Sequence, residues 1–238
     1  MIGFVATMPA VYERLYGAQE CAEHAAIVSR RAGRLVHAEL WQSSKGPVLC
    51  VVAEDRPGFL ALVTDTLLMQ GMAIKSARAF CRVAGQDSLE AVDFLELHEL
   101  GSAGGTPARL DSEALPAFVQ SLTELIGNEL APRGAQSPDT LPPSDGVRTT
   151  RVYFEREPPG EGRYLLVVEA PDSDGLLHAI SSALLAQGVR IMACEIRTLN
   201  GRASDRFEVE PVSRQFLRDS ELCDVQLAVL DALPSRSR

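Results

Sequence analysis

The chain has 238 residues, of which 46% are hydrophobic, and it carries a formal net charge of −9 with a sequence pI near 5.0. This length can hold two small domains with proper hydrophobic cores. The acidic balance and the lack of Lys/Arg clusters argue against binding to nucleic acid or to an anionic membrane, because neutralising phosphates requires basic side chains.

The same sequence shows no sign of export or of a membrane span. No apolar run approaches the roughly 20 residues that a membrane helix needs, and the N-terminus lacks the charged and apolar regions of a signal peptide. The cysteines are scattered without a Cys-x-x-Cys pair, at Cys21, Cys50, Cys81, Cys194 and Cys223. We therefore expect a cytoplasmic protein with reduced thiols, without a metal site and without a cofactor.

Hydrophobic patterning predicts the elements of the first half. Apolar residues that recur every three or four positions indicate helices, and alternating or continuous apolar runs indicate strands. In chain order we expect a helix, two strands, a helix, two strands and a helix, over residues 12–31, 35–41, 48–53, 55–70, 73–83, 90–98 and 111–130. The first helix is expected to bury Leu15, Ala22, Ala26 and Ile27, and to dock on the sheets or to mediate dimerisation.

A linker separates this half from a second one with the same pattern. Residues 131–146 read APRGAQSPDTLPPSDG, which is rich in Pro, Ser and Gly and has no apolar periodicity. Beyond it we expect strands over 151–155, 164–168, 189–198 and 205–209, and helices over 172–187 and 213–233. The predicted organisation is a helical segment at 1–32, a domain at 33–130, a linker at 131–147 and a second domain at 148–235.

The two halves are copies of one module. An offset of 117 gives eight identities between residues 55–78 and their counterparts, including Asp55 with Asp172 and Gly58 with Gly175. Beyond the following loop the offset becomes 112, which pairs Asp93 with Asp205 and Glu96 with Glu208. Repetition at a fixed spacing is the signature of a duplicated domain.

The order of elements predicts an α+β fold built from two ferredoxin-like units. Each unit should form a four-stranded antiparallel sheet with helices on one face. The tight turn after the leading strand predicts that it pairs with the next strand, in the place that the last strand of an ordinary βαββαβ sheet occupies. Each unit would then be a circular permutation of that fold. The alternative is that each leading strand closes the neighbouring repeat.

Two stretches carry a family resemblance. EDRPGFLALVTDTLLMQGMAI and APDSDGLLHAISSALLAQGVRI each run from a strand through an Asp and a Gly into an apolar helix that ends at Gly. The Asp-Arg-Pro-Gly-hydrophobic-Leu pattern resembles the ACT domain, a module that senses small molecules. The tandem spacing, together with the Met-Pro…Tyr…His segment before the first copy, resembles the C-terminal regulatory region of PII uridylyltransferases over roughly residues 8–233. In that family, paired ACT domains sense glutamine.

The two Asp-to-Gly corners are the predicted ligand sites. A helix N-terminus offers unpaired amides and a partial positive charge, and a glycine lets a ligand approach the backbone closely. A free amino acid fits such a corner if its carboxylate meets the amides and its ammonium meets Asp55 or Asp172. The alternative is that Asp55 only caps its helix and that Gly58 only allows close packing.

The resemblance extends these sites along the chain. ACT ligands typically bind between the first strand–helix turn of one unit and the second strand of another. For the first site the predicted residues are Asp55, Arg56, Gly58, Phe59, Leu60, Ile74 and Ser76. For the second site they are Asp172, Gly175, Leu176, Leu177, Ile191 and Ala193. The second copy departs from the pattern, because Ser173-Asp174 replaces Arg-Pro and adds a carboxylate that disfavours an anionic ligand group.

The sequence offers no catalytic centre. None of the four histidines is followed by Asp, as a metal-binding His-Asp hydrolase requires. Gly101-Ser102 followed by Asp111-x-Glu113 imitates a nucleotidyltransferase, but Ser112 is polar where the metal-binding strand needs a buried residue. We expect an amino-acid-sensing regulatory protein of nitrogen or amino-acid metabolism rather than an enzyme, with glutamine favoured by resemblance. It would dimerise through its ACT sheets and control an enzyme in trans. The alternatives are a dimerisation module that senses nothing and, least favoured, a remnant uridylyltransferase.

Overall fold

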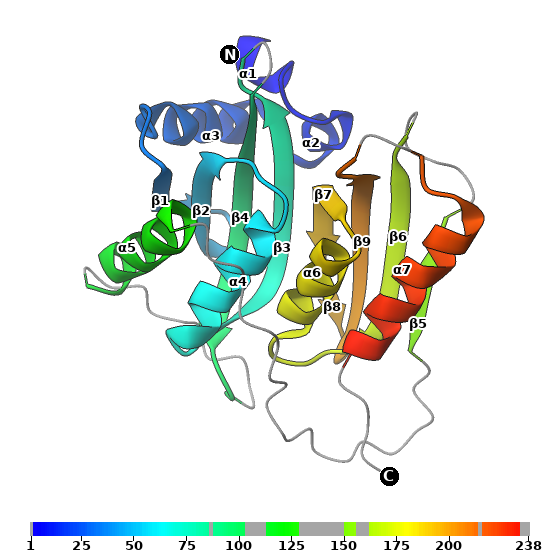
Figure 1. Cartoon of the computed structure of the whole chain (residues 1–238). Coiled ribbons are helices and arrows are strands. Elements are labelled where there is room, and N and C mark those ends of the chain that lie inside the picture. The colour runs from blue at the N-terminus through cyan, green and yellow to red at the C-terminus, as the bar shows by residue number, and fades with distance from the viewer. Residues whose placement is uncertain are drawn as a thin grey trace.

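A computed structural model describes residues 2–85, 88–102, 113–128, 150–155, 162–213 and 216–233. Within these ranges the strands form one nine-stranded sheet in which every neighbouring pair is antiparallel. The path across the sheet is β1-β2-β4-β3-β7-β9-β6-β5, with the short β8 beside β9. The first unit supplies one side of this sheet and the second unit supplies the other (Figure 1).

Each unit contains the elements that the sequence predicts, in the same order. The first unit consists of β1 (Val36–Ser43), β2 (Gly46–Glu54), α4 (Phe59–Met69), β3 (Met72–Val83), β4 (Leu89–Glu99) and α5 (Ala114–Gly127). The second consists of β5 (Arg151–Phe154), β6 (Tyr164–Pro171), α6 (Leu176–Ala186), β7 (Val189–Ile196), β8 (Thr198–Leu199), β9 (Arg202–Pro211) and α7 (Asp219–Ala232). The linker expected over 131–147 lies outside the described residues, so the domain boundaries stay a prediction.

The leading strand of each unit pairs within its own unit. β1 runs antiparallel to β2, and β5 runs antiparallel to β6. In each unit the last strand, β4 or β9, lies between the two strands that the helix connects. This is the ferredoxin-like order with the leading strand in the outer place, so the predicted fold class and its permutation are confirmed. The alternative, in which leading strands close the neighbouring repeat, is wrong.

The two units join edge to edge about an approximate two-fold axis. β3 pairs with β7 so that Ala77 faces Ile196, Arg78 faces Glu195 and Ala79 faces Cys194. With the repeat offset of 117, Arg78 and Glu195 are equivalent residues, so each copy presents the same strand to the other. The Arg78 Nε lies 3.3 Å from a carboxylate oxygen of Glu195. The duplication therefore builds a symmetric pairing inside one chain.

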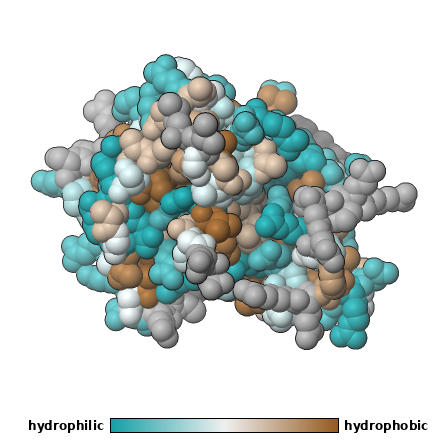
Figure 2. All heavy atoms as spheres, turned by 90° about the horizontal axis from the view of Figure 1, so that it is seen from above, coloured by the Kyte–Doolittle hydropathy of each residue, from teal (hydrophilic) through white to brown (hydrophobic). Residues whose placement is uncertain are grey.

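The helices of the repeats cover one face of the sheet. α4, α5, α6 and α7 lie on the same side in Figure 1 and enclose a core in which Leu62, Leu95, Phe118 and Ile180 are fully buried. Seen from the end at which α1 lies, the surface is mainly hydrophilic, with hydrophobic residues gathered near its middle (Figure 2). The core runs without interruption from one unit to the other.

The N-terminal segment docks on the opposite face of the first unit, as one of the two predicted alternatives states. It forms α1 (Ile2–Val5), α2 (Ala10–Leu15) and α3 (Ala18–Arg30). Residues of α2 and α3, with the Tyr16 between them, pack on the far side of β1, β2, β3 and β4. The buried cluster consists of Met8, Tyr12, Tyr16, Cys21, Ile27, Val28, Trp41, Val48, Cys50, Val52, Phe80, Val92, Phe94 and Ala193.

The single helix expected over residues 12–31 is a pair of helices. The chain is extended at Tyr16 and Gly17, and the Gly17 amide donates to the Glu20 carboxylate at 2.9 Å, which starts a new helix. Because the break resets the helical phase, the predicted buried side is also wrong in part. Ala26 is exposed, and α3 buries Cys21, His24, Ile27 and Val28.

The four helices of the repeats start later than expected, α4 at Phe59 instead of residue 55 and α6 at Leu176 instead of residue 172. α7 begins at Asp219 rather than at residue 213, because the Arg218 amide donates to the Glu221 carboxylate at 2.7 Å and fixes the first turn there. α5 begins at Ala114, and the expected cap Asp111 lies outside the described residues.

Candidate ligand pockets between the two units

Each Asp-to-Gly segment forms a turn that precedes its helix. Gly58 and Gly175 take positive φ angles of 82° and 81° and are the N-cap residues of α4 and α6. The expectation that Asp55 caps its helix is therefore wrong. The amide of Phe59 donates to the Arg56 carbonyl at 3.0 Å, and that of Leu176 to the Ser173 carbonyl at 3.1 Å. The next amides of each first turn have no partner within the helix.

A pocket lies beside each of these corners, at the junction of the two units. The first pocket holds about 430 Å³ of space, part of it continuous with solvent. Its walls are the Asp55-to-Ala61 segment of the first unit and residues 189–192 at the start of β7. The second pocket holds about 420 Å³, between the Asp172-to-His178 segment and residues 72–74 at the start of β3.

Most predicted site residues line the pocket of their own corner. In the first pocket these are Asp55, Arg56, Gly58, Phe59 and Leu60. In the second they are Asp172, Gly175, Leu176 and Leu177. Ile74 was predicted for the first site and Ile191 for the second, but the assignment is reversed. Ile191 lines the first pocket and Ile74 lines the second, because one wall of each pocket is a strand of the opposite unit.

Ser76 and Ala193 line neither pocket. The register of β3 shifts between Ile74 and Ser76, and that of β7 shifts at the equivalent place, between Ile191 and Ala193. Such a bulge sets two residues opposite one and turns the following side chains to the other face of the sheet. Ala193 accordingly packs in the cluster beneath α2 and α3.

Asp55 lines the first pocket and already interacts with two side chains. Its Oδ2 accepts a hydrogen bond from the Cys81 thiol at 3.2 Å and lies 3.7 Å from the Arg190 Nε, which comes from the second unit. Burial raises the pKa of the Asp55 carboxyl, while the Cys81 hydrogen bond and the Arg190 charge act in the opposite direction. The ion pair therefore spans the junction between the units.

A second carboxyl in each pocket escaped the sequence analysis. Asp93 on β4 and Asp205 on β9 line the first and the second pocket, and the Oδ2 of each has no hydrogen-bond partner among the described residues. Burial raises the pKa of Asp93 well above its ordinary range and that of Asp205 to about 7, and the charges of Asp55 and Asp172 respectively add to this. The available signal was an Asp at equivalent positions of two strands, with apolar residues two positions away on either side.

The two pockets differ in charge. Arg190 stands in the first pocket, and the residue equivalent to it in the second pocket is Ala73. Asp172 receives a hydrogen bond from Thr198, and burial raises its pKa. Among the described residues that line the second pocket there is no Arg or Lys.

Asp174 does not add a carboxylate to the second pocket, contrary to the expectation from its place in the motif. Its two oxygens accept hydrogen bonds from the His98 Nε2 at 2.9 Å and from the Gly101 amide at 2.8 Å. Both donors belong to the first unit, where β4 ends. Asp174 thus ties the second corner to the first unit and lies outside the walls of the second pocket.

Close packing accounts for the glycine at position 58. A Cβ built on Gly58 would lie 2.5 Å from the Leu185 Cδ2, whereas one built on Gly175 would lie 3.8 Å from the Leu68 Cδ1. Leu185 and Leu68 are equivalent residues of the repeat. The packing alternative is therefore supported at Gly58, while the space beside that corner stays open.

Relatives of the chain include several bifunctional uridylyltransferase/uridylyl-removing enzymes. The protein from Streptomyces coelicolor is 30% identical over 172 residues, which cover 69% of this chain and 19% of the relative. That from Aromatoleum aromaticum is 27% identical over 213 residues, covering 85% and 23%. That from Ralstonia nicotianae is 27% identical over 192 residues, covering 79% and 21%. The chain is homologous to part of these uridylyltransferases.

The uridylyltransferase homology covers most of this chain but only about a fifth of each relative. It is consistent with the regulatory region that the sequence motifs indicate. No protein-family model matches the chain. A similar solved structure is aspartate kinase from Synechocystis, with a TM-score of 0.41 and 10% identity over 80% of this chain and 28% of that one. None of the helices in the described part of the chain is long and apolar enough to cross a membrane.

Proposed function

We propose that this chain is a cytoplasmic regulatory protein that senses a free amino acid, with glutamine as the favoured ligand, and that it has no catalytic activity of its own. The observation that carries the proposal is the pair of pockets at the junction of two ACT-like units, each with a helix N-terminus on one wall and a buried carboxyl within. Homology to part of bifunctional uridylyltransferases supports a role in nitrogen metabolism.

A ligand between the units can act on their pairing. Each pocket takes one wall from a strand–helix turn and the other from a strand of the opposite unit, so a bound molecule contacts both. A ligand that prefers one arrangement of the units shifts the equilibrium towards it by the difference in its affinities. Sensing near millimolar concentrations requires only about −4 to −6 kcal/mol of binding free energy.

A screen of the twenty common amino acids at about 10 mM tests the proposal through thermal unfolding. A ligand at 100 times its Kd raises the free energy of unfolding by about 2.7 kcal/mol, which corresponds to a rise in Tm of roughly 5–10 °C for a chain of this size. D-glutamine is the matched control for L-glutamine. The absence of stabilisation by every amino acid would contradict the proposal.

The second candidate is an interaction module that senses nothing. It is favoured by the ladder between β3 and β7 and by the Leu185 contact at Gly58, which need no ligand. We propose in addition that the chain forms a homodimer through its sheets and acts on a separate enzyme. Light scattering reports the mass in solution, and a monomeric mass would rule out the dimer.

A remnant uridylyltransferase activity is the least favoured candidate. Incubation with labelled UTP, magnesium and a PII protein is expected to give no label on the protein. Transfer of label would overturn the non-catalytic part of the proposal.

A further inference from the structure

A buried hydrogen-bond acceptor without a partner lies at the bottom of the first pocket. Asp93 is 2% exposed, and its neighbours across the sheet are Val51 and Ala79. These neighbours belong to the core beneath α4, so the carboxyl points to the helix side of the sheet, where the pocket lies. An acceptor held away from water without a donor is costly, so a group of this kind calls for a partner.

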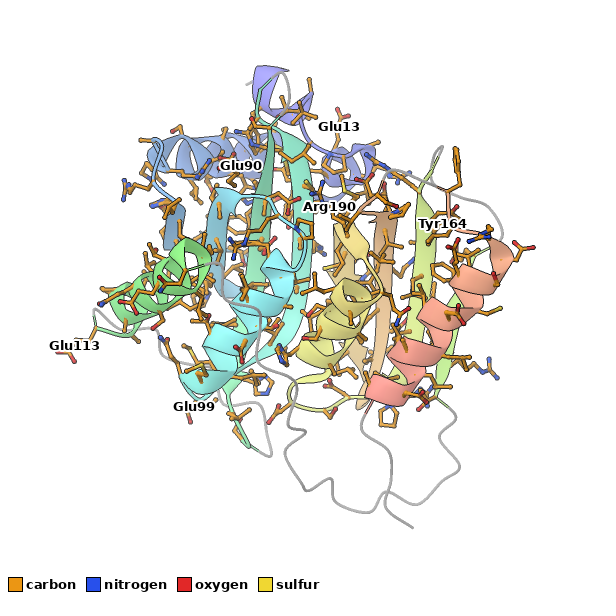
Figure 3. All side chains as sticks on the ribbon, in the orientation of Figure 1. Glu13, Glu90, Glu99, Glu113, Tyr164 and Arg190 are labelled. Atoms are coloured by element: carbon orange, nitrogen blue, oxygen red, sulfur yellow. The ribbon has the colours of Figure 1, made fainter. Side chains whose placement is uncertain are left out.

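A positively charged donor faces the same pocket from the second unit. The Arg190 Nε is buried and has no hydrogen-bond partner among the described residues, although its charge lies 3.7 Å from Asp55. Arg190 sits near the start of β7, between the two halves of the sheet (Figure 3). Asp55 already receives the Cys81 thiol, which leaves Asp93 as the unpartnered acid of this pocket.

The first pocket therefore combines a buried acid oxygen that has no hydrogen bond with an arginine whose Nε has none either, although that guanidinium lies within ion-pair distance of Asp55 and Glu210. An α-amino acid carries the complementary pair, an ammonium group with three donors and a carboxylate with two acceptor oxygens, and charge-assisted hydrogen bonds of this kind are strong. A metal ion is a poorer match, since the described residues contain no group of three or more His, Cys, Asp or Glu side chains that could hold one.

The second pocket has the acceptor alone. Asp205 repeats the arrangement of Asp93, but Ala73 occupies the place of Arg190, so a ligand carboxylate would find no Arg or Lys among the described lining residues. The histidine that lines this pocket, His178, has its Nδ1 3.0 Å from the Thr64 hydroxyl. The two copies thus share the buried Asp, and among the described lining residues only the first pocket has an Arg.

We propose that the first pocket, and not the second, binds the zwitterionic amino acid, with Asp93 accepting from its ammonium group and Arg190 donating to its carboxylate. This inference rests on the proposed amino-acid sensing and assigns it to one pocket and to two residues from different units. It predicts one bound amino acid per chain.

Isothermal titration of the full chain with L-glutamine tests the assignment. Asp93→Asn keeps the shape of the side chain but cannot become an anion, and Arg190→Gln replaces the guanidinium with a shorter, neutral amide. Each is expected to weaken binding at least about 10-fold, because a hydrogen bond to a charged group of the ligand is lost or weakened. The matched control is Arg163→Gln, an exchange at a partly exposed ion pair with Glu208. This control should bind within about twofold of the unaltered chain.

Two ligand analogues separate recognition from a structural effect. Glutaramate is glutamine with hydrogen in place of the α-ammonium group, and L-glutaminamide has a neutral amide in place of the α-carboxylate. The unaltered chain should prefer L-glutamine to each analogue at least about 10-fold. Asp93→Asn should lose most of its discrimination against glutaramate, and Arg190→Gln most of its discrimination against L-glutaminamide. A variant with a merely structural defect would bind all three ligands more weakly by the same factor.

The possible failures are distinguishable. If no amino acid binds the unaltered chain, the proposed function fails and this inference falls with it. If L-glutamine binds but Asp93→Asn and Arg190→Gln leave its affinity and its preference over the analogues unchanged, only the assignment is overturned. Two equivalent sites per chain would also overturn it, and this stoichiometry is measured on the unaltered protein, so it does not depend on any variant folding.

Discussion

The two units share one fold but differ on the face of the sheet that points away from α4 and α6. In the first unit this face carries Phe80, Val92 and Phe94, which pack beneath α2 and α3. The equivalent residues of the second unit are Arg197, Ser204 and Arg206, all of them exposed. Duplicated strands therefore keep the pattern of the face that fills the shared core. On the other face the residues differ according to what covers them. They are hydrophobic under the helical segment of the first unit and polar where the second unit faces water.

Removing one aromatic ring from the covered face of the first unit and one from the open face of the second should give the largest difference in the free energy of unfolding. The ring on the covered face is that of Tyr12 in α2. Tyr12 is 0% exposed, contacts the rings of Phe4, Tyr16 and Phe80, and shares a 2.7 Å hydrogen bond with His24. Tyr12→Ala should lower the free energy of unfolding by about 3–5 kcal/mol, since a buried ring leaves a cavity. Urea denaturation followed by circular dichroism measures this loss.

Tyr153→Ala is the matched exchange on the second unit. Tyr153 is 38% exposed on β5, so its loss should change the free energy of unfolding by no more than about 0.5–1 kcal/mol. Equal losses in the two variants would show that the covered and the open face contribute alike, and the contrast drawn above would be wrong.

A buried acid of the second unit should make stability depend on pH. Asp205 has a pKa of about 7 in the folded chain, against about 3.9 when unfolded. Between these values the folded state keeps the proton that the unfolded state releases, so the contribution of Asp205 to the free energy of unfolding falls as the pH rises from about 4 to 7 and then levels off.

Asp205→Asn should remove this contribution, while those of Asp55, Asp93 and Asp172, whose pKa values burial also raises, remain. The variant should match the unaltered chain at pH 4 and exceed its free energy of unfolding at pH 8 by about 2–4 kcal/mol, because a shift of one pKa unit corresponds to about 1.36 kcal/mol. Urea midpoints at the two pH values report the difference. A constant gap between the two proteins across this range would mean that Asp205 does not titrate there.

The smallest expected effect compares the two glycine corners. Alanine at either position must adopt a left-handed backbone, which costs about 1–2 kcal/mol. At Gly58 the added methyl group also meets Leu185, whereas at Gly175 it reaches Leu68 at an ordinary contact distance. Gly58→Ala should therefore cost about 1 kcal/mol more than Gly175→Ala, as measured by urea denaturation. The excess should disappear in a Leu185→Ala background, and its persistence there would contradict the packing explanation.

Much of the fold was predictable because the sequence contains the same pattern of strands and helices in both halves. Helices such as α4 and α6 carry strong apolar periodicity and end at glycines with positive φ, and the eight identities fixed how the halves correspond. The place of the leading strand followed from short turns. These features depend on residues close together in the sequence, which is where pattern and propensity are informative.

The misplaced parts depend on contacts between distant segments. The bulge that turns Ser76 away from the pocket is a property of its pairing with β4, and Asp174 finds its donors at His98 and Gly101, about seventy residues earlier in the chain. The exchange of Ile74 and Ile191 between the pockets follows from the pairing of β3 with β7. Asp93 was noticed only as a repeated residue, since nothing local shows that a carboxyl on an apolar strand lines a cavity.

The axis between the units has a consequence for how the halves recognise each other. In a dimer of two identical units, a residue on the axis would face its own copy, so two Arg78 side chains or two Glu195 side chains would repel across the central strands. Because the copies are fused, these positions hold opposite charges and face each other directly. In the fused chain, the equivalent edge strands β3 and β7 have become complementary in charge. If the two units were separated, each should therefore bind the other unit in preference to a second copy of itself.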